Sequence, residues 1–364
     1  MSQSIELTSG SILNGSPITL SVTPNNFRDV SMHRIILEVE CGMSGGDYEV
    51  IKLSSPVITE GEAQTIDISS ALRTFRDSYE YTPNPTTYPL VKFNVKAYDE
   101  YMVNGEVKSP VDPVWYPQNP ANLPADRRDE AYLRTIFGAF SDLDRLTSGV
   151  TKGVTTLSRK PTTSPHLAVI GETFAYTPPY SGEELLEESR DLTPPQSKVV
   201  TVTKAGLQTL GYQSIFALQP SIDNPRQQFR FINSFGVLES ISVPQSHSKK
   251  LAIKSEKYAI ARQETFNRFS RAAIRKQNNQ ESWLFQSDPL TEEWLYWYLH
   301  EFLMSEHVWL LLPSLTAGGA GGGSVWLPCT ITPNENTTIL DRTKADTYTV
   351  SFTAILDING SPLR

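Results

Sequence analysis

The last third of the sequence constrains the fold most, because strand-like apolar runs lie on both sides of one amphipathic helix, predicted over residues 289–307. Asp288 is the predicted N-cap, and Pro289 suits the first helical position. Apolar side chains recur every three or four residues and share one face: Trp294, Leu295, Tyr298, Leu299, Phe302 and Leu303. Polar side chains are expected off that face: His300, Glu301, Ser305 and Glu306.

The runs around this helix are rich in β-branched and aromatic residues, which favours strands. They cover residues 228–240, 308–312, 325–328 and 348–356. The glycine-rich stretch 316–324 is predicted to be a flexible hairpin tip between two of them. Residues 251–283 fit a helix weakly, and we favour a β-hairpin with its loop near Asn278 and Asn279. Residues 214–364 are therefore expected to form a C-terminal β-rich module.

The first 120 residues show the polar–apolar alternation of half-buried strands. The predicted strands cover residues 5–7, 17–22, 33–40, 48–53, 64–68 and 91–97. Asn104-Gly105 predicts a tight hairpin turn, and residues 69–75 predict one helical turn capped by a serine. Short strands at this spacing are typical of an immunoglobulin-like or fibronectin-like sandwich. Residues 1–120 are therefore predicted to be an N-terminal β-sandwich.

Residues 121–213 are predicted to be an extended arm or insertion, because prolines interrupt regular structure both before and after residue 121. A short helix is expected over residues 127–141 with Asp126 as its cap. The stretch with the acidic residues 183–188 suits either a mobile arm or an extension that wraps a neighbouring subunit, and residues 198–202 return to strand. The predicted fold class is thus mainly β, with sandwich modules, one amphipathic helix in the C-terminal module and a Pro-rich extended middle segment.

Composition narrows the class of protein further. The net charge of −8 makes a broad phosphate-binding surface unexpected, so we do not predict nucleic acid as a partner. Cys41 and Cys329 are too few for a four-cysteine zinc site and are expected to be buried free thiols. No secretory signal is recognised at the N-terminus, and no apolar run approaches about 20 residues, so no membrane partner is expected.

Motifs that carry chemistry are incomplete. His300-Glu301 begins like a zinc-protease motif, but Met304 stands where the second histidine is needed. His300 and His307 are two helical turns apart, about 10.5 Å, which is too far for one ion. The glycine tract lacks the Gly-Lys-Ser/Thr ending of a phosphate loop, and adjacent glutamates do not set the spacing of a glycosidase pair. We therefore predict no catalytic, cofactor-binding or metal-binding residues, no cofactor and no enzyme activity.

One basic region stands out in this acidic chain, and aromatic residues are interleaved with it. Its cations are Lys249, Lys250, Lys254, Lys257, Arg262, Arg268, Arg271, Arg275 and Lys276. The favoured interpretation is a contact with a partner or another subunit, with the acidic arm around residues 183–191 as the hypothetical counterpart. A solvated face is the next interpretation, and a nucleic-acid surface is the least favoured because of the overall charge.

Several of these segments together resemble virion proteins of tailed phages, especially phages of Bacteroides-type hosts. They are the aromatic strand with Asn-x-x-Gly at residues 231–236, the basic strands, the helix beginning at residues 291–295, and the segment 137–145. The resemblance implies a tail, baseplate or connector-ring protein that assembles as a homo-oligomeric ring with other tail proteins. It implies that the protein is made in the host cytoplasm and resides in the virion.

Two other functions stay open at this point. A carbohydrate-binding or receptor-binding β module of a tail fibre or cell surface could stack sugars on Trp297, Trp309 or Trp326. These tryptophans lie inside apolar runs, so core packing is the favoured interpretation for them. An enzyme, such as a glycan depolymerase, is the third possibility.

Overall fold

The chain is mainly β and forms two compact units. The computed structural model describes residues 3–10, 12–25, 27, 30–43, 46–58, 62–109, 112–139, 157–161, 164–178, 189–190, 192–210, 213–222, 225–245, 248–260, 271–313, 324–333 and 348–358. Strands far outnumber helices in the described residues, which confirms the predicted mainly β fold class. Unit 1 contains residues 1–158, 177–198 and 233–237, and unit 2 contains the rest. Residues of the predicted middle segment, 121–213, are divided between the two units.

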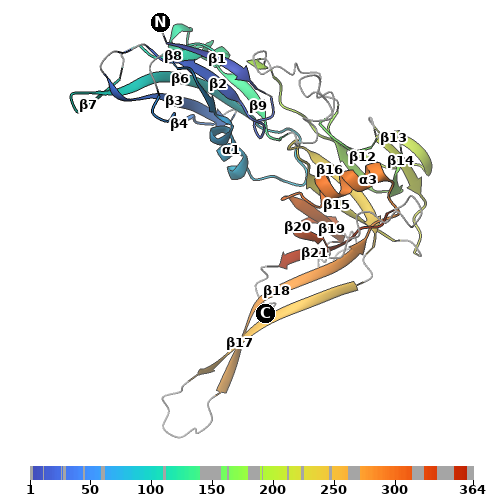
Figure 1. Cartoon of the computed structure of the whole chain (residues 1–364). Coiled ribbons are helices and arrows are strands. Elements are labelled where there is room, and N and C mark those ends of the chain that lie inside the picture. The colour runs from blue at the N-terminus through green and yellow to red at the C-terminus, as the bar shows by residue number, and fades with distance from the viewer. Residues whose placement is uncertain are drawn as a thin grey trace, which may run out of the picture. The chain divides into compact units, whose positions relative to one another are not determined.

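Unit 1 is built from two antiparallel sheets (Figure 1). The smaller sheet has the order β1 (Ser4–Ser9), β2 (Thr19–Thr23), β5 (Gln64–Asp67). The larger sheet has the order β4 (Glu49–Ser54), β3 (Ser31–Met43), β6 (Leu90–Val103), β7 (Glu106–Lys108). Two further strands of this sheet also pair with β6: β8 (Val114–Tyr116) and β9 (Leu133–Ile136). Alternate residues are buried along β2 and along parts of β3 and β6, as the sequence pattern predicts for a sandwich.

Two turn elements of unit 1 show how local sequence sets the backbone. Asn104 and Gly105 have φ of +53° and +84°, so they form the predicted tight turn between β6 and β7. Helix α1 (Ser69–Ser78) includes the predicted helical turn, but its N-cap residue is Ile68 and not a serine. The Asp67 carboxylate instead accepts a hydrogen bond from the Ser69 backbone N–H at 2.9 Å. The prediction of a serine cap was therefore wrong.

The helix predicted over residues 127–141 is absent from the described part of that range. A 3-10 helix, η2 (Arg128–Ala131), is followed directly by strand β9. In β9, Leu133 pairs with Phe93 and Ile136 pairs with Leu90, and both residues are buried. Burial against β6 satisfies the same apolar positions that suggested a helix, so tertiary pairing overrides the local pattern.

Unit 2 is organised around a seven-stranded antiparallel sheet. Its order is β16 (Leu238–Pro244), β15 (Arg226–Ile232), β19 (Val308–Pro313), β20 (Ser324–Pro333), β21 (Ser351–Ile358), β18 (Arg271–Gln286), β17 (Ser248–Ile260). Two small sheets accompany it, with the orders β10 (His166–Val169), β14 (Gln213–Leu218), β13 (Gly206–Leu210) and β11 (Thr173–Tyr176), β12 (Lys198–Thr201).

The C-terminal helix is shorter than predicted. Helix α3 (Glu292–Trp297) continues as one π-helical segment, η4 (Tyr298–Phe302), and its N-cap is Thr291 rather than Asp288. The chain before it is extended because the backbones of Leu290 and Tyr348 exchange hydrogen bonds of 2.7 and 2.9 Å. The predicted apolar stripe is confirmed, since five of its side chains are buried: Trp294, Leu295, Tyr298, Phe302 and Leu303. No helix among the described residues is long and apolar enough to cross a bilayer.

The predicted hairpin of the basic region is present, but its turn lies elsewhere. Strands β17 and β18 pair from Ser248↔Leu284 to Ile260↔Arg271. Asn278 and Asn279 therefore lie inside β18, beside a register shift between Ile253 and Lys254, and the predicted loop position was wrong. Strands β19 and β20 pair antiparallel, while the predicted glycine-rich tip and the acidic stretch 183–188 lie outside the described residues.

Candidate functional site

The most unusual surface of unit 2 is the far end of the β17–β18 hairpin. Strand β21 pairs with β18 only over residues 279–286, and β17 is the last strand of the sheet. Among the described strands, residues 254–260 and 271–277 pair only with each other. We call these two segments the ribbon, and Figure 1 shows it extending beyond the rest of the seven-stranded sheet. Its outer edges carry backbone N–H and C=O groups that no described strand pairs with.

The length of the ribbon makes these edges significant. At roughly 3.4 Å per residue, residues 271–277 extend for about 24 Å past the end of the β21 pairing. A two-stranded hairpin is at best marginally stable in water when no third strand or core supports it. A long strand edge is also a template for pairing with another chain. The ribbon can therefore gain stability when a partner strand or surface covers it.

The basic charge of the ribbon makes it less able to pair indiscriminately with the strands of other proteins. The strands that form it carry Lys254, Lys257, Arg271, Arg275 and Lys276, and lysine on an edge strand opposes indiscriminate pairing. At the base of the hairpin, the Lys249 ammonium lies 2.7 Å from the Glu281 carboxylate and 4.7 Å above the Trp283 ring. The basic sequence beyond that point favours a partner surface that is acidic.

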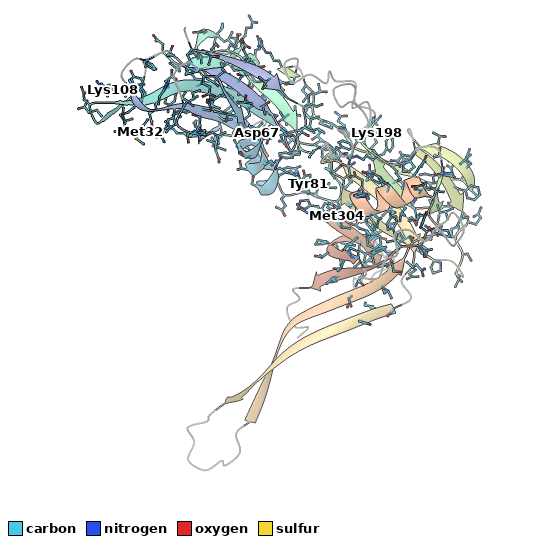
Figure 2. All side chains as sticks on the ribbon, in the orientation of Figure 1. Met32, Asp67, Tyr81, Lys108, Lys198 and Met304 are labelled. Atoms are coloured by element: carbon cyan, nitrogen blue, oxygen red, sulfur yellow. The ribbon has the colours of Figure 1, made fainter. Side chains whose placement is uncertain are left out.

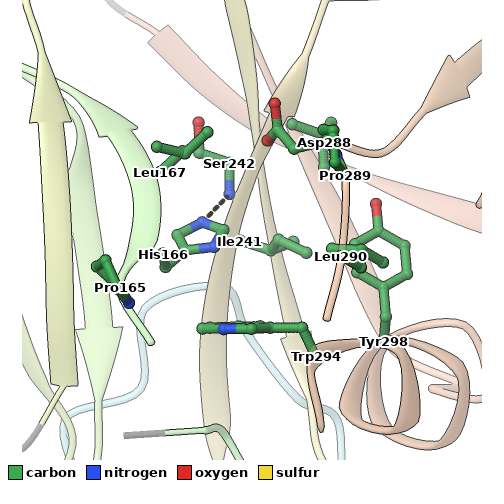
Figure 3. A pocket seen from close by; sticks show the side chains of 11 residues that line it. Pro165, His166, Leu167, Ile241, Ser242, Asp288, Pro289, Leu290, Trp294 and Tyr298 are labelled. Carbon is green, nitrogen blue, oxygen red and sulfur yellow. Dashed lines mark hydrogen bonds between the residues drawn. The ribbon is translucent and has the colours of Figure 1, made fainter. Parts of the chain in front are cut away.

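A second candidate site in unit 2 is a small pocket next to α3 (Figure 3). Its volume is about 60 Å³, which is room for about two water molecules. His166 of β10 lies over the Trp294 ring, with the ring centroids 5.4 Å apart. The Asp288 carboxylate and the Tyr298 hydroxyl line the opposite side. The pocket thus combines a histidine, a serine and a carboxylate, which are the residue types of a nucleophilic site.

The hydrogen bonds show what these groups do. The Ser242 backbone N–H donates to His166 Nε2 at 3.0 Å, so the lone pair of that nitrogen is occupied. The Ser242 hydroxyl donates to Glu172 at 2.8 Å and accepts from Arg226 Nε at 2.9 Å. Arg226 also binds both Asp288 oxygens, at 3.1 and 2.6 Å. The serine hydroxyl does not contact the histidine, as a nucleophile and its base would.

Burial explains the charge states in this network. Burial lowers the pKa of His166 well below its usual value, and the nearby Lys160 and Arg226 lower it further. Burial also raises the pKa of the Glu172 carboxyl, although the Val169 N–H and the Ser242 hydroxyl oppose the change. A neutral His166 can accept the Ser242 N–H, and this contact joins β10 to β16. The network therefore has a structural explanation that needs no substrate.

The tryptophans proposed for sugar stacking are mostly core residues. Trp297 is fully buried, and its indole N–H donates to the Glu239 carboxylate at 2.8 Å. Trp309 is also buried, which confirms the core interpretation for both residues. Trp326 is half-buried, and the Arg230 guanidinium lies 4.4 Å from its ring centroid. The described structure thus gives neither Trp297 nor Trp309 a face on which a sugar ring could stack.

The histidines and cysteines give simple results. His300 is exposed and packs against Tyr296 with ring centroids 4.3 Å apart, while His307 stacks near Trp309. Among the described residues, no group of three His, Cys, Asp or Glu side chains is placed to hold a metal ion. The two cysteines are free and buried, as predicted. Burial raises the pKa of each thiol to about 12, so neither is a reactive thiolate.

One polar residue of the predicted helix was assigned to the wrong environment. Glu301 was expected off the apolar face, but it is 2% exposed and forms an ion pair with Arg159. The partner is 142 positions away in the sequence, so no local pattern could indicate it. A buried carboxylate requires such a partner, because an unpaired charge in an apolar environment is very unfavourable.

Comparisons with known proteins add no functional assignment. No protein-family model matches the chain, and no curated protein matches it. The function is therefore inferred from the molecule's own surfaces and buried groups.

Proposed function

We propose that this chain is a structural virion protein of a tailed phage, which forms part of a tail, baseplate or connector ring by oligomeric assembly. The observation that carries the proposal is the ribbon, an extension of the seven-stranded sheet whose two strands, among the described strands, pair only with each other. In this proposal the partners are further copies of the chain and neighbouring tail proteins, and the protein is not an enzyme.

A ring explains why the ribbon differs chemically from the rest of the chain. Subunits in a ring meet through two different surfaces, so one surface must complement another rather than itself. The chain as a whole has a net charge of −8, whereas the ribbon strands are rich in lysine and arginine. A basic ribbon on one subunit and an acidic surface on the next would attract each other and would disfavour ribbon-to-ribbon pairing.

The ribbon also suits a structural role energetically. Pairing of its edge with a neighbour would add backbone hydrogen bonds along residues whose outer groups have no strand partner in the described chain. The same segment would be only marginally stable in a lone subunit. Assembly and ordering of the ribbon would therefore favour each other.

Mass photometry of the purified full-length protein, with negative-stain images of the same sample, tests the proposal. The expected result is a closed ring whose mass is a fixed multiple of the 40.6 kDa subunit. The ring population should fall as the salt concentration rises, because the proposed contact is electrostatic. A monomer at every concentration and at low salt would contradict self-assembly.

A further inference from the structure

Lys160 of unit 2 has a fully enclosed amine. The residue is 4% exposed, and its Nζ donates hydrogen bonds to the Gln213 side-chain oxygen at 3.1 Å and to the Ser240 carbonyl at 3.0 Å. Three aromatic rings surround the amine, with centroids 5.3 to 5.9 Å from Nζ: those of Phe174, Trp294 and Trp297. Lysine is almost never buried in this way, so the arrangement requires an explanation.

Gln213, the first residue of β14, is the direct neighbour of that amine. It is 2% exposed, and its side-chain oxygen receives the Lys160 hydrogen bond. Its side-chain nitrogen, Nε2, has no hydrogen-bond partner among the described residues. A buried amide nitrogen without an acceptor is unfavourable, and release of this nitrogen would remove the penalty.

Glu239 of β16 supplies a carboxyl group to the same enclosure. It is 1% exposed, and its Oε2 accepts the Trp297 indole N–H at 2.8 Å. Burial lowers the pKa of Lys160 to about 8, although the negative charge of Glu239 acts in the opposite direction. The lowered pKa favours the neutral form of the Lys160 amine, which has the lone pair that a nucleophile needs.

We propose that Lys160 and Gln213 join through an isopeptide bond between the lysine Nζ and the glutamine side-chain carbonyl carbon, with release of ammonia and with Glu239 as the proton carrier. The evidence is the geometry: a buried amine in contact with a buried amide whose nitrogen has no partner among the described residues, and a buried carboxylate that binds Trp297, one of the rings around the amine. The site is a self-modification site, and its substrate is the chain's own glutamine.

The reaction balances without any added reagent. The Lys160 ammonium first gives one proton to the Glu239 carboxylate, and the neutral Nζ then attacks the Gln213 carbonyl carbon. The new N–C bond forms as the carbonyl electron pair moves to the oxygen. When the carbonyl re-forms, the bond from carbon to Nε2 breaks. The Glu239 carboxyl group gives its proton to Nε2, which leaves as ammonia, and then takes up a second proton from Nζ, so that Glu239 ends in its neutral form.

The enclosure favours this reaction over hydrolysis. The amine and the amide are held in contact, which removes most of the entropic cost of bringing two groups together. The aromatic rings exclude water and reduce the stabilisation of the charged starting groups, so neutral species form more readily there than in solvent. The product would link positions 160 and 213 covalently. A cross-link across such a long loop restricts the unfolded chain and would resist heat or mechanical load.

The mass of the intact, denatured full-length protein tests the proposal directly. The protein is incubated folded at pH 8 and then measured by mass spectrometry and by peptide mapping. We expect a mass lower by one ammonia than the sequence requires, and a branched peptide that joins Lys160 to Gln213. A folded protein that keeps the full sequence mass, with both residues recovered in linear peptides, would overturn the proposal.

Two variants identify the reacting groups. Lys160→Met should abolish the ammonia loss, and an ammonia loss that persists in this variant would overturn the assignment of the nucleophile. Glu239→Gln can still accept the Trp297 N–H and should fold, as circular dichroism would verify, but should stay unlinked. Linking of this variant at the unchanged rate would overturn the role of Glu239 as the proton carrier.

A third variant, Gln213→Glu, tests the proposed bond through the mass of the linked product. Gln213→Glu would release water instead of ammonia, so its linked form has the same mass as the linked original protein. The matched control is Gln208→Glu on β13, a half-buried position, where the mass difference made by the substitution should persist. Any Gln213→Glu product with the mass of the linked protein supports the proposed bond. The bond is contradicted if the original protein shows the ammonia loss but a peptide other than Gln213 carries it.

Discussion

Gly138 and Phe235 approach so closely that a β-carbon on Gly138 would lie 2.6 Å from the Phe235 Cα. The relationship is reciprocal, because a β-carbon on Gly236 would collide with the backbone of Phe137. The Ala139 N–H donates to the Ser234 carbonyl at 2.8 Å between the same two segments. Gly138 and Gly236 also have φ of +139° and +76°, which other residues rarely adopt. Both glycines are therefore required by space and by backbone conformation.

Substitution of Gly138 by alanine should be severely destabilising. The added methyl group has backbone atoms on its far side, and these cannot rotate away as a side chain would. We expect a loss of more than about 2 kcal/mol in the free energy of unfolding of unit 1. The control is Gly105→Ala, where φ is +84° but no atom lies within 4 Å, so only the backbone cost of about 1 kcal/mol applies. Urea denaturation of both variants measures the difference, and equal losses would contradict the close approach.

Local sequence predicted the main strands of unit 1 well because polar and apolar residues alternate in them, and this alternation matches the burial along β2 and parts of β3 and β6. It also predicted the turn at Asn104-Gly105, since few dipeptides adopt two positive φ angles. The helix predicted over residues 127–141 failed because the same apolar spacing is satisfied by β9 against β6. A pattern of apolar residues reports burial, and the neighbour that provides the burial decides between helix and strand.

Glu38 should make unit 1 sensitive to acid. Burial alone would raise the pKa of this carboxyl, but hydrogen bonds from Lys52, Lys96 and Tyr98 outweigh burial and lower the pKa to about 2. The two ammonium groups lie 2.8 Å from its oxygens. Because the pKa is lower in the folded chain, the stabilisation is complete above the ordinary value of 4.5. It should be lost as the pH falls from there towards 2.

The variant Glu38→Gln tests this interpretation. It should lower the free energy of unfolding at pH 7 by about 1 kcal/mol, because the ion pairs lie near the surface and solvent screens them. The stability difference from the original protein should disappear at low pH. Glu106→Gln, an exposed position on β7, is the control and should leave the pH profile unchanged. A constant difference from pH 7 to pH 3 would show that charge is not the cause.

His166 should give unit 2 a separate dependence on pH. Burial lowers its pKa well below 6.5, and Lys160 and Arg226 act in the same direction, so the folded chain keeps the ring neutral. The unfolded chain takes up a proton below about pH 6.5, and stability should therefore fall as the pH decreases. Each pH unit in that range should cost up to about 1.4 kcal/mol. His166→Gln, which can still accept the Ser242 N–H, should flatten the profile.

The control for this variant is His300→Gln on the exposed side of the π-helical segment. This substitution removes a histidine that is exposed to solvent, so the fall in stability between pH 7 and pH 5 should persist. Thermal unfolding followed at several pH values measures both variants. An unchanged fall in His166→Gln would mean that another group takes up the proton.

The contacts between buried polar groups of unit 2 could not be predicted from sequence patterns. Glu301 and Arg159 form their pair across 142 positions, and Lys160 meets Gln213 across 53. Each residue alone is an ordinary polar position in a loop, a short strand or a helix. Only the folded sheet brings them together, so the signal is in three-dimensional packing and not in spacing along the chain.

Shortening of the ribbon should prevent assembly but should leave the chain able to fold. Replacement of residues 254–278 by an Asn-Gly turn joins Ile253 to Asn279, which are paired in the original hairpin, and keeps the β18–β21 pairing. The shortened chain should fold but should stay monomeric in mass photometry, because the edge that we propose for the neighbour is gone. Deletion of residues 262–269 alone keeps both ribbon strands and should still give rings. Rings formed by the shortened chain would exclude the ribbon as the subunit contact.

Charge reversal in the basic region tests the electrostatic part of the contact. The double variant Arg268→Glu and Arg271→Glu, of which Arg268 lies outside the described residues, should weaken assembly at low salt, because the basic region would then attract an acidic partner surface less. Lys108→Glu in the exposed β6–β7 hairpin (Figure 2) is the matched control, since it reverses a charge in unit 1 and should not alter the rings. High salt should reduce the difference between the variant and the original protein. Equal ring populations for all three proteins at low salt would show that basic charge does not guide the assembly.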